Sequence, residues 1–99
     1  MSQLSLTPQS DNVMLLSGDL TFATIDKKTA QLIDFTKISL PLVIDFAQVR
    51  NSDSAGLALL IEWLKMSQTG QAQLHFKNIP AQLLTLAQLS GFDLSPYFA

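Results

Sequence analysis

The sequence predicts an α/β domain in which helices pack against a small mixed β-sheet. Apolar and polar residues alternate at residues 4–6 and 72–76, and residues 42–46 form a nearly continuous apolar run, as is typical of strands. Between these runs the apolar residues recur at the 3.6-residue spacing of helices. We therefore expect one domain over residues 1–99 with the element order β-β-α-β-α-β-α.

The first two strands are expected to pair as an antiparallel hairpin. Residues 4–6 precede a polar turn over residues 8–12, the second strand runs over residues 13–16, and residues 17–19 close it. The joining turn is short and polar, which favours direct pairing of the two strands.

An amphipathic helix is expected over residues 22–35, because apolar side chains recur there at helical spacing. Thr21 or Thr24 is its candidate N-cap. The positions that define the spacing are Ile25, Thr29, Leu32 and Ile33. The run at residues 42–46 then suits a central strand that is covered on at least one face.

The central helix is expected to begin in the polar run Ser52-Asp53-Ser54 and to extend to about Gln68, with Gly70 as its stop. At about 100° per residue, one side of this helix carries a core stripe. The stripe consists of Leu57, Leu60, Ile61 and Leu64.

A second apolar stripe, Leu59, Trp63 and Met66, lies on nearly the opposite side of the same helix and is flanked by Glu62. A helix that lies on a sheet needs only one apolar face, so a second face requires another cover. Another helix, the C-terminal aromatic residues or a partner protein can supply it, and we favour a partner. This interpretation predicts that the stripe is exposed in the isolated domain, where it also allows a weak homodimer.

The C-terminal part is expected to contain one strand and one helix. In the strand at residues 72–76, Leu74 and Phe76 point inward while Gln73 and His75 point outward. The last helix spans residues 80–90, stops at Gly91 and is followed by a tail, residues 92–98, that packs onto the domain. Its buried side chains are Leu83, Leu86 and Ala87.

The composition excludes several classes of function. The net charge is −2 and the six Lys and Arg residues are scattered, which argues against a nucleic-acid partner. The N-terminus has no cationic start and no long apolar run, so no signal peptide is expected. The longest mostly apolar stretch, residues 56–64, is far shorter than a membrane span. We expect a soluble protein without membrane insertion.

No catalytic residue, metal site or cofactor is expected. A nucleophilic Ser54 needs a nearby base, and the only histidine, His75, lies on another strand and points outward. One histidine without any cysteine makes a metal site improbable. Asp45, near the end of an apolar strand, is expected to accept hydrogen bonds from backbone amides of the following loop. Ser54 at a helix start is either a cap or a position where a phosphoryl group is stabilised.

Three segments together resemble the STAS family (sulfate transporter and anti-sigma-factor antagonist). They are Leu-Leu-Ser-Gly-Asp-Leu at residues 15–20, Val-Ile-Asp-Phe at residues 43–46 and Asp-Ser-Ala-Gly-Leu at residues 53–57. Within that family, residues 56–60 and 83–87 are most similar to the small cytoplasmic STAS subunits of Mla transporters. These are ABC transporters that move phospholipids between the membranes of Gram-negative bacteria.

The resemblance implies a non-catalytic subunit that binds the ATP-binding subunit of the transporter and supports its assembly and ATPase activity. Such a chain is cytoplasmic and is held at the inner membrane through the transporter. The partner contact is expected at the start and outer face of the central helix. The residues concerned are Ser52, Ser54, Ala55, Gly56, Leu59, Glu62, Trp63 and Met66.

The resemblance also leaves an alternative open. Ser54 matches the Ser/Thr position of the family at the helix start, where anti-sigma-factor antagonists are phosphorylated. The Mla subunits carry threonine at this position, so the serine is a departure from that subfamily. The alternative function is an anti-sigma-factor antagonist that is switched by phosphorylation of Ser54.

Overall fold

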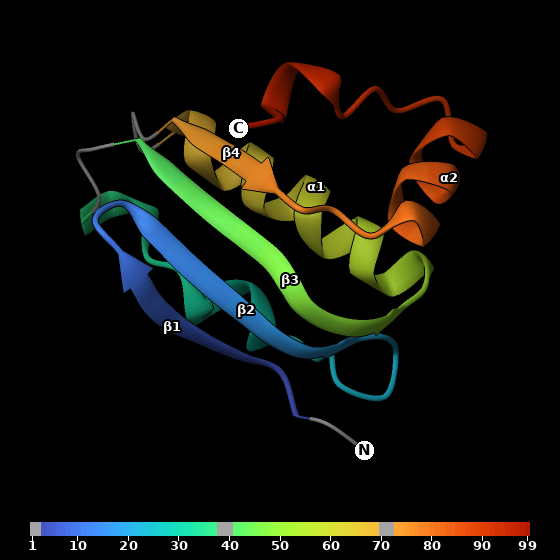
Figure 1. The fold of residues 1–99 in the computed structure, drawn as a ribbon, viewed down its shortest axis with the longest axis horizontal. Coiled ribbons are helices and arrows are strands. Elements are labelled where there is room, and N and C mark those ends of the chain that lie inside the picture. Colours follow the sequence, from blue (N-terminus) through green and yellow to red (C-terminus); the bar gives the residue numbers. More distant parts are fainter. Residues whose placement is uncertain (1–2, 38–40, 70–72) are drawn as a thin grey trace.

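The structure, a computed structural model, describes residues 3–37, 41–69 and 73–99. A four-stranded sheet lies at its centre, in the spatial order β1-β2-β3-β4 (Figure 1). β1 is antiparallel to β2, whereas β2, β3 and β4 are parallel to one another. The strands are β1 (Ser5–Ser10), β2 (Val13–Leu20), β3 (Leu42–Ser52) and β4 (Leu74–Lys77). The predicted mixed sheet and N-terminal hairpin are therefore confirmed.

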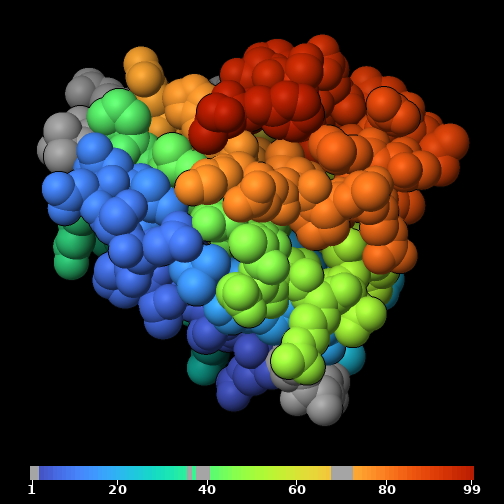
Figure 2. Space-filling model, viewed as in Figure 1, coloured from blue at the N-terminus to red at the C-terminus, as the bar shows by residue number. Residues whose placement is uncertain are grey.

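The helical elements form a layer on one face of this sheet. α1 (Ser54–Thr69) connects β3 to β4 and lies behind the strands in Figure 1, with α2 (Ala81–Leu89) beside it. The other helical elements are the short 3₁₀ turns η1 (Thr29–Leu32), η2 (Phe35–Lys37) and η3 (Ser95–Tyr97). On the opposite face the strands stay at the surface, where their blue, green and orange segments lie side by side in Figure 2.

The core lies between the sheet and the helices. Strand side chains that point toward the helices are almost fully buried, and the Phe46 and Phe76 rings pack edge to face with centroids 5.5 Å apart. The helices contribute their inward stripes, as the sequence predicts, although Ile61 and Leu86 are only half-buried. The largest fully buried side chains are Trp63, Phe46, Phe76, Leu16, Leu20, Ile44, Leu60 and Leu83.

The prediction of a helix over residues 22–35 is wrong. That stretch contains only the turns around η1 and the start of η2. Thr24 donates its hydroxyl to the Asp19 and Thr21 carbonyl oxygens, and the Thr29 hydroxyl accepts from the Asp26 backbone N–H at 2.9 Å. Because such side chains bond to nearby backbone groups, they compete with the hydrogen bonds of a regular helix. The chain therefore makes successive short turns where the apolar spacing alone predicts one helix.

The remaining helix boundaries agree with the prediction closely, whereas the strands are longer than predicted. β1 continues through residues 8–10, where a turn was predicted. β2 continues through residues 17–19, where a turn was predicted, and β3 continues to Ser52. α2 ends before Gly91, whose φ of +76° favours glycine, and the Phe92 N–H donates to the Ala87 carbonyl oxygen at 2.9 Å. The predicted stop at Gly70 lies outside the described residues.

The tail packs onto the domain, as predicted. Leu94 is buried, and the Ala99 N–H donates to the Phe76 carbonyl oxygen at 2.9 Å. Phe98 forms an isolated parallel bridge with Phe76 at the outer edge of β4. The tail is therefore held at both ends, by the end of α2 and by β4.

Candidate partner-binding site

The start of α1 lies directly against the end of β2. The Asp53 N–H donates to the Leu20 carbonyl oxygen at 3.1 Å. Gly56 is buried, and a Cβ atom at this position would lie 2.7 Å from the same carbonyl oxygen. Glycine is therefore required for the helix to begin so close to the strand.

The Asp53 carboxylate joins the helix start to the loop that follows β2. Its Oδ1 accepts from the Ala55 N–H at 2.9 Å, which satisfies one of the free donors of the first helical turn. Its Oδ2 accepts from the Phe22 N–H at 3.2 Å. Of the three predicted N-cap candidates, Asp53 is thus the residue whose side chain bonds to the helix start.

A groove lies between this loop and α1, and we call it the Phe22 groove. It has a volume of about 560 Å³, and its lining includes Phe22, Ile25, Lys27, Ser54, Ala58 and Glu62. The Phe22 side chain is 75% exposed, so the groove presents an aromatic ring to the solvent. Ser54, Ala58 and Glu62 are exposed at four-residue spacing, so one face of α1 forms the second wall.

The prediction that the stripe of Leu59, Trp63 and Met66 is exposed was wrong. Leu59 and Trp63 are buried, with exposed fractions of 4% and 0%, and Met66 is half-buried. The Trp63 Nε1–H donates to the Ala30 carbonyl oxygen at 3.1 Å. The cover is thus neither a partner nor the tail. It is the part of the chain around η1, which packs against this side of α1.

Ser52 also differs from the prediction, because it is buried at the end of β3. Its hydroxyl lies 3.3 Å from Gln82 Oε1, to which it donates, so it contacts α2. Gly56 is likewise buried against β2 and does not reach a free surface. The predicted site residues that line the Phe22 groove are Ser54, Ala55, Leu59 and Glu62.

The lining of the groove also includes Phe22, residues 25–27, Ala30 and Ala58, which the sequence analysis did not assign to a site. Phe22 was assigned to the first turn of an amphipathic helix, so its exposure was not expected. Ala58 was detectable, because it lies four residues from both Ser54 and Glu62 and belongs to neither apolar stripe.

Asp45 occupies a separate buried position on β3. Its Oδ1 accepts from the Ala47 N–H and from Asn78 Nδ2, both at 2.9 Å. The predicted bond to a backbone amide is therefore present, but the amide belongs to β3 itself and not to the loop that follows the strand. Burial raises the pKa of the Asp45 carboxyl, but hydrogen bonds from Asn78, Ala47 and Gln9 outweigh this effect and hold the pKa below its ordinary value. Asp45 thus stabilises the turn that leads from β4 to α2.

Ser54 and His75 do not form a nucleophile–base pair. His75 pairs with Val43 near the beginning of β3, whereas Ser54 follows the end of that eleven-residue strand. Within residues 3–37, 41–69 and 73–99, no three His, Cys, Asp or Glu side chains cluster as metal ligands. Among those residues there is also no helix that is long and apolar enough to span a membrane.

A family model described as "Mlab, STAS domain" matches residues 3–94. The chain belongs to the STAS family. The predicted family is thereby confirmed, and the segments that carried the resemblance lie at the end of β2, along β3 and at the start of α1. No curated protein matches this STAS domain significantly.

Two solved structures share the fold of this STAS domain. The Bacillus cell fate determinant SpoIIAA in its phosphorylated form matches with a TM-score of 0.65 and 14% sequence identity, over 97% of this chain and 88% of that one. The anti-sigma factor antagonist SpoIIAA in its unphosphorylated form gives 0.55 and 11%, over 87% of this chain and 82% of that one. At these identities the comparison shows the fold alone.

Proposed function

We propose that this STAS domain is a non-catalytic subunit that binds the ATP-binding subunit of an Mla-type phospholipid ABC transporter through the Phe22 groove. The observation that carries the proposal is the groove itself, an exposed aromatic side chain beside the free face of α1. The description of the matching family model supports the choice of transporter class. The proposal places the chain on the cytoplasmic side of the inner membrane, where it is held by its partner.

The chemistry of the groove supports a protein partner. Full burial of Phe22 by a partner would gain about 1.5–3 kcal/mol, and aromatic residues are enriched at interfaces. Ala58 has a small side chain, so a partner can approach the helix closely. Lys27 and Glu62 give the groove charges of both signs, which favour one docking orientation over others.

The same geometry supports a non-catalytic role. Ser54 has no histidine base beside it, because His75 lies by the opposite end of β3. Asp53 accepts hydrogen bonds from two backbone N–H groups, which accounts for its position at the helix start.

Binding of the cognate ATP-binding subunit by a Phe22→Ser variant tests the proposal. We expect the affinity to fall about 10- to 100-fold, since the substitution removes the apolar side chain that the partner buries. Leu89→Ser is the matched control, because Leu89 is 80% exposed on α2, away from the groove. The affinity is measured with purified proteins and by co-purification from membranes.

Wild-type affinity of the Phe22→Ser variant would contradict the proposed surface. Trp63→Ala is not a suitable test of binding, because Trp63 belongs to the core and its loss changes stability. Glu62→Lys gives a second, independent variant on an exposed residue of the groove. It is expected to change the salt dependence of binding without changing the fold.

One observation favours a second function, that of a phosphorylation-switched antagonist. Ser54 is exposed at the first residue of α1, where backbone N–H groups favour an anion. A phosphoryl group there adds a charge of about −1.5 to −2 beside the groove. Mass spectrometry of the chain from cells distinguishes the two functions. Phosphate on Ser54, with partner binding lost in Ser54→Asp, favours the antagonist.

A further inference from the structure

The two walls of the Phe22 groove carry charges of opposite sign. Lys27 lines the groove from the loop that follows β2, and Glu62 lines it from α1. Both side chains are exposed. Within the parts of the chain that the structure describes, neither forms an ion pair, with the other or with a third residue. The two charges are therefore available to a partner.

The third charged residue of the groove, Asp26, is engaged within its own loop. Its Oδ1 accepts from the Lys28 backbone N–H at 2.8 Å and from the Thr29 hydroxyl at 3.2 Å. These hydrogen bonds, with the nearby charge of Lys28, hold the pKa of the Asp26 carboxyl below its ordinary value. The loop wall thus offers a partner the ammonium group of Lys27, whereas the helix wall offers the carboxylate of Glu62.

The rest of the groove is mostly apolar. Of its uncharged described lining residues only Ser54 is polar, and the others are Phe22, Ile25, Ala30, Ala55, Ala58 and Leu59. A partner side chain that fills this space is therefore expected to be apolar. Because such a side chain excludes water, it also strengthens any ion pair that forms beside it.

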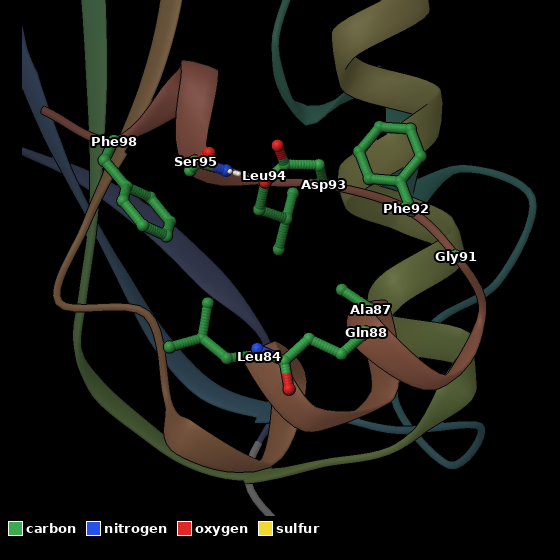
Figure 3. A pocket seen from close by; sticks show the side chains of 9 residues that line it. All are labelled: Leu84, Ala87, Gln88, Gly91, Phe92, Asp93, Leu94, Ser95 and Phe98. Carbon is green, nitrogen blue, oxygen red and sulfur yellow. Dashed lines mark hydrogen bonds between the residues drawn. The ribbon is translucent and has the colours of Figure 1, made fainter.

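A second apolar concavity lacks this arrangement. It lies between α2 and the tail, has a volume of about 480 Å³, and has Leu84 and Phe98 pointing into it (Figure 3). Of its described lining residues only Asp93 is charged, and the Asp93 Oδ1 already accepts from the Ser95 N–H at 2.9 Å. Two unpaired charges of opposite sign thus distinguish the Phe22 groove from the other concavity.

We propose that the partner subunit places an apolar side chain against Phe22 and flanks it with a basic group that faces Glu62 and an acidic group that faces Lys27. This inference rests on the proposed function and specifies the chemistry of the partner's contact segment. Because the two charges lie on different walls, they fix the direction in which that segment crosses the groove. A segment with the reverse charge order would bring like charges together at both walls.

Binding of the cognate ATP-binding subunit by a variant with the two charges exchanged tests the inference. The Lys27→Glu/Glu62→Lys double variant keeps the net charge of −2 and the apolar lining, and it reverses only the charge order. We expect the double variant to raise Kd about 100-fold and each single variant to raise it about 10-fold.

Asp11→Lys is the matched control for Glu62→Lys, because it changes the net charge by the same amount. Asp11 is exposed before the beginning of β2, whereas the groove follows the end of that strand. We expect this control to change Kd by less than about 2-fold, since charges that are exposed and distant from the contact are screened.

The salt dependence of Kd separates the charge order from a structural defect. The affinity of the wild type is expected to fall between about 50 mM and about 500 mM NaCl, because its attractive pairs are screened. The affinity of the double variant is expected to rise over the same range, because its like-charge contacts are screened. Far-UV circular dichroism checks that the double variant is folded.

A folded double variant that binds like the wild type overturns the inference, and so does one whose affinity falls with salt as the wild type's does. If Phe22→Ser nevertheless loses binding, the groove is the contact surface and only the charge order is wrong. If Phe22→Ser binds like the wild type, the proposed function of the groove is wrong as well.

Discussion

The segment between β2 and β3 and the region formed by α2 and the tail pack against opposite sides of α1, and they do so with different chemistry. In the first, side chains of Thr24, Asp26 and Thr29 bond to backbone groups of their own turns. In the second, backbone groups mostly bond to one another, as at the helix end where Phe92 bonds to Ala87. Local side-chain bonds replaced a regular helix in the first region, whereas the second kept its helical hydrogen bonds.

The two regions also differ in charge. The first carries five charged residues between residues 21 and 37, while residues 78–99 carry only Asp93. Each region leaves a large apolar side chain exposed, Phe22 in the first and Leu89 in the second. Charges of both signs around Phe22 favour one docking orientation over others, whereas Leu89 lies in nearly uncharged surroundings. The two exposed apolar side chains therefore differ in the electrostatic discrimination that they offer a partner.

The largest expected effect concerns the packing of the first region on α1. Trp63→Ala removes a fully buried indole and its hydrogen bond to Ala30, so we expect a loss of about 3–5 kcal/mol in the free energy of unfolding. Urea denaturation followed by far-UV circular dichroism measures it. Leu89→Ala, on an exposed position of the second region, is the control and is expected to change stability by less than about 0.5 kcal/mol. Equal stability of the two variants would mean that the segment does not cover Trp63.

A smaller effect on the free energy of unfolding is expected at Gly56, at the start of α1. In Gly56→Ala the new Cβ would lie 2.7 Å from the Leu20 carbonyl oxygen and 2.9 Å from Leu20 Cβ, so the helix must move at a cost of about 1–3 kcal/mol. Gly91→Ala is the comparison in the second region, where no atom lies within 4 Å and only the positive φ opposes the change, at about 1 kcal/mol. The same denaturation experiment ranks them, and a more stable Gly56→Ala would contradict the close approach.

The smallest expected effect on stability concerns Asp45, which holds the turn that leads into α2, and this effect depends on pH. The pKa of Asp45 is lower in the folded protein than its ordinary value of about 3.9, so its carboxylate stabilises the fold above that pH. This contribution is lost as the pH falls through the lowered pKa. We expect Asp45→Asn to reduce stability at pH 7 by about 1 kcal/mol and to make stability less dependent on pH below about pH 4.

Asp11→Asn is the matched control for this pH effect, because Asp11 is exposed in the turn between β1 and β2. Unfolding curves recorded at several pH values measure both variants. An Asp45→Asn protein that loses stability in acid as steeply as the wild type would show that Asp45 does not hold the turn before α2.

The sequence predicted those elements whose signals are local. Gly91 after an apolar-periodic run marks the end of α2, and the alternation around Leu74 and Phe76 marks β4. The segment of residues 21–37 could not be predicted in the same way. Its apolar spacing fits a helix, but Thr24, Asp26 and Thr29 bond to nearby backbone groups. The spacing of apolar residues does not show whether such local bonds or regular helical bonds form.

The candidate site was predictable only where its signals are local in the sequence. The motif at residues 53–57 located the start of α1, and Ser54 and Glu62 do line the groove. The exposure of Phe22 and the burial of Trp63 both depend on how the preceding loop lies on α1. That is a tertiary property, which the periodicity of α1 alone does not contain.

The position of Trp63 has a further, spectroscopic consequence. The chain contains a single tryptophan and a single tyrosine, and each contacts a different region. Trp63 of α1 donates a hydrogen bond to Ala30 in the first region, and Tyr97 stacks on Phe92 in the tail. Indole emission from this dry position shifts to longer wavelength when water reaches the ring. The unlabelled protein thus carries separate optical probes for the two sides of α1, and fluorescence can determine which side opens first.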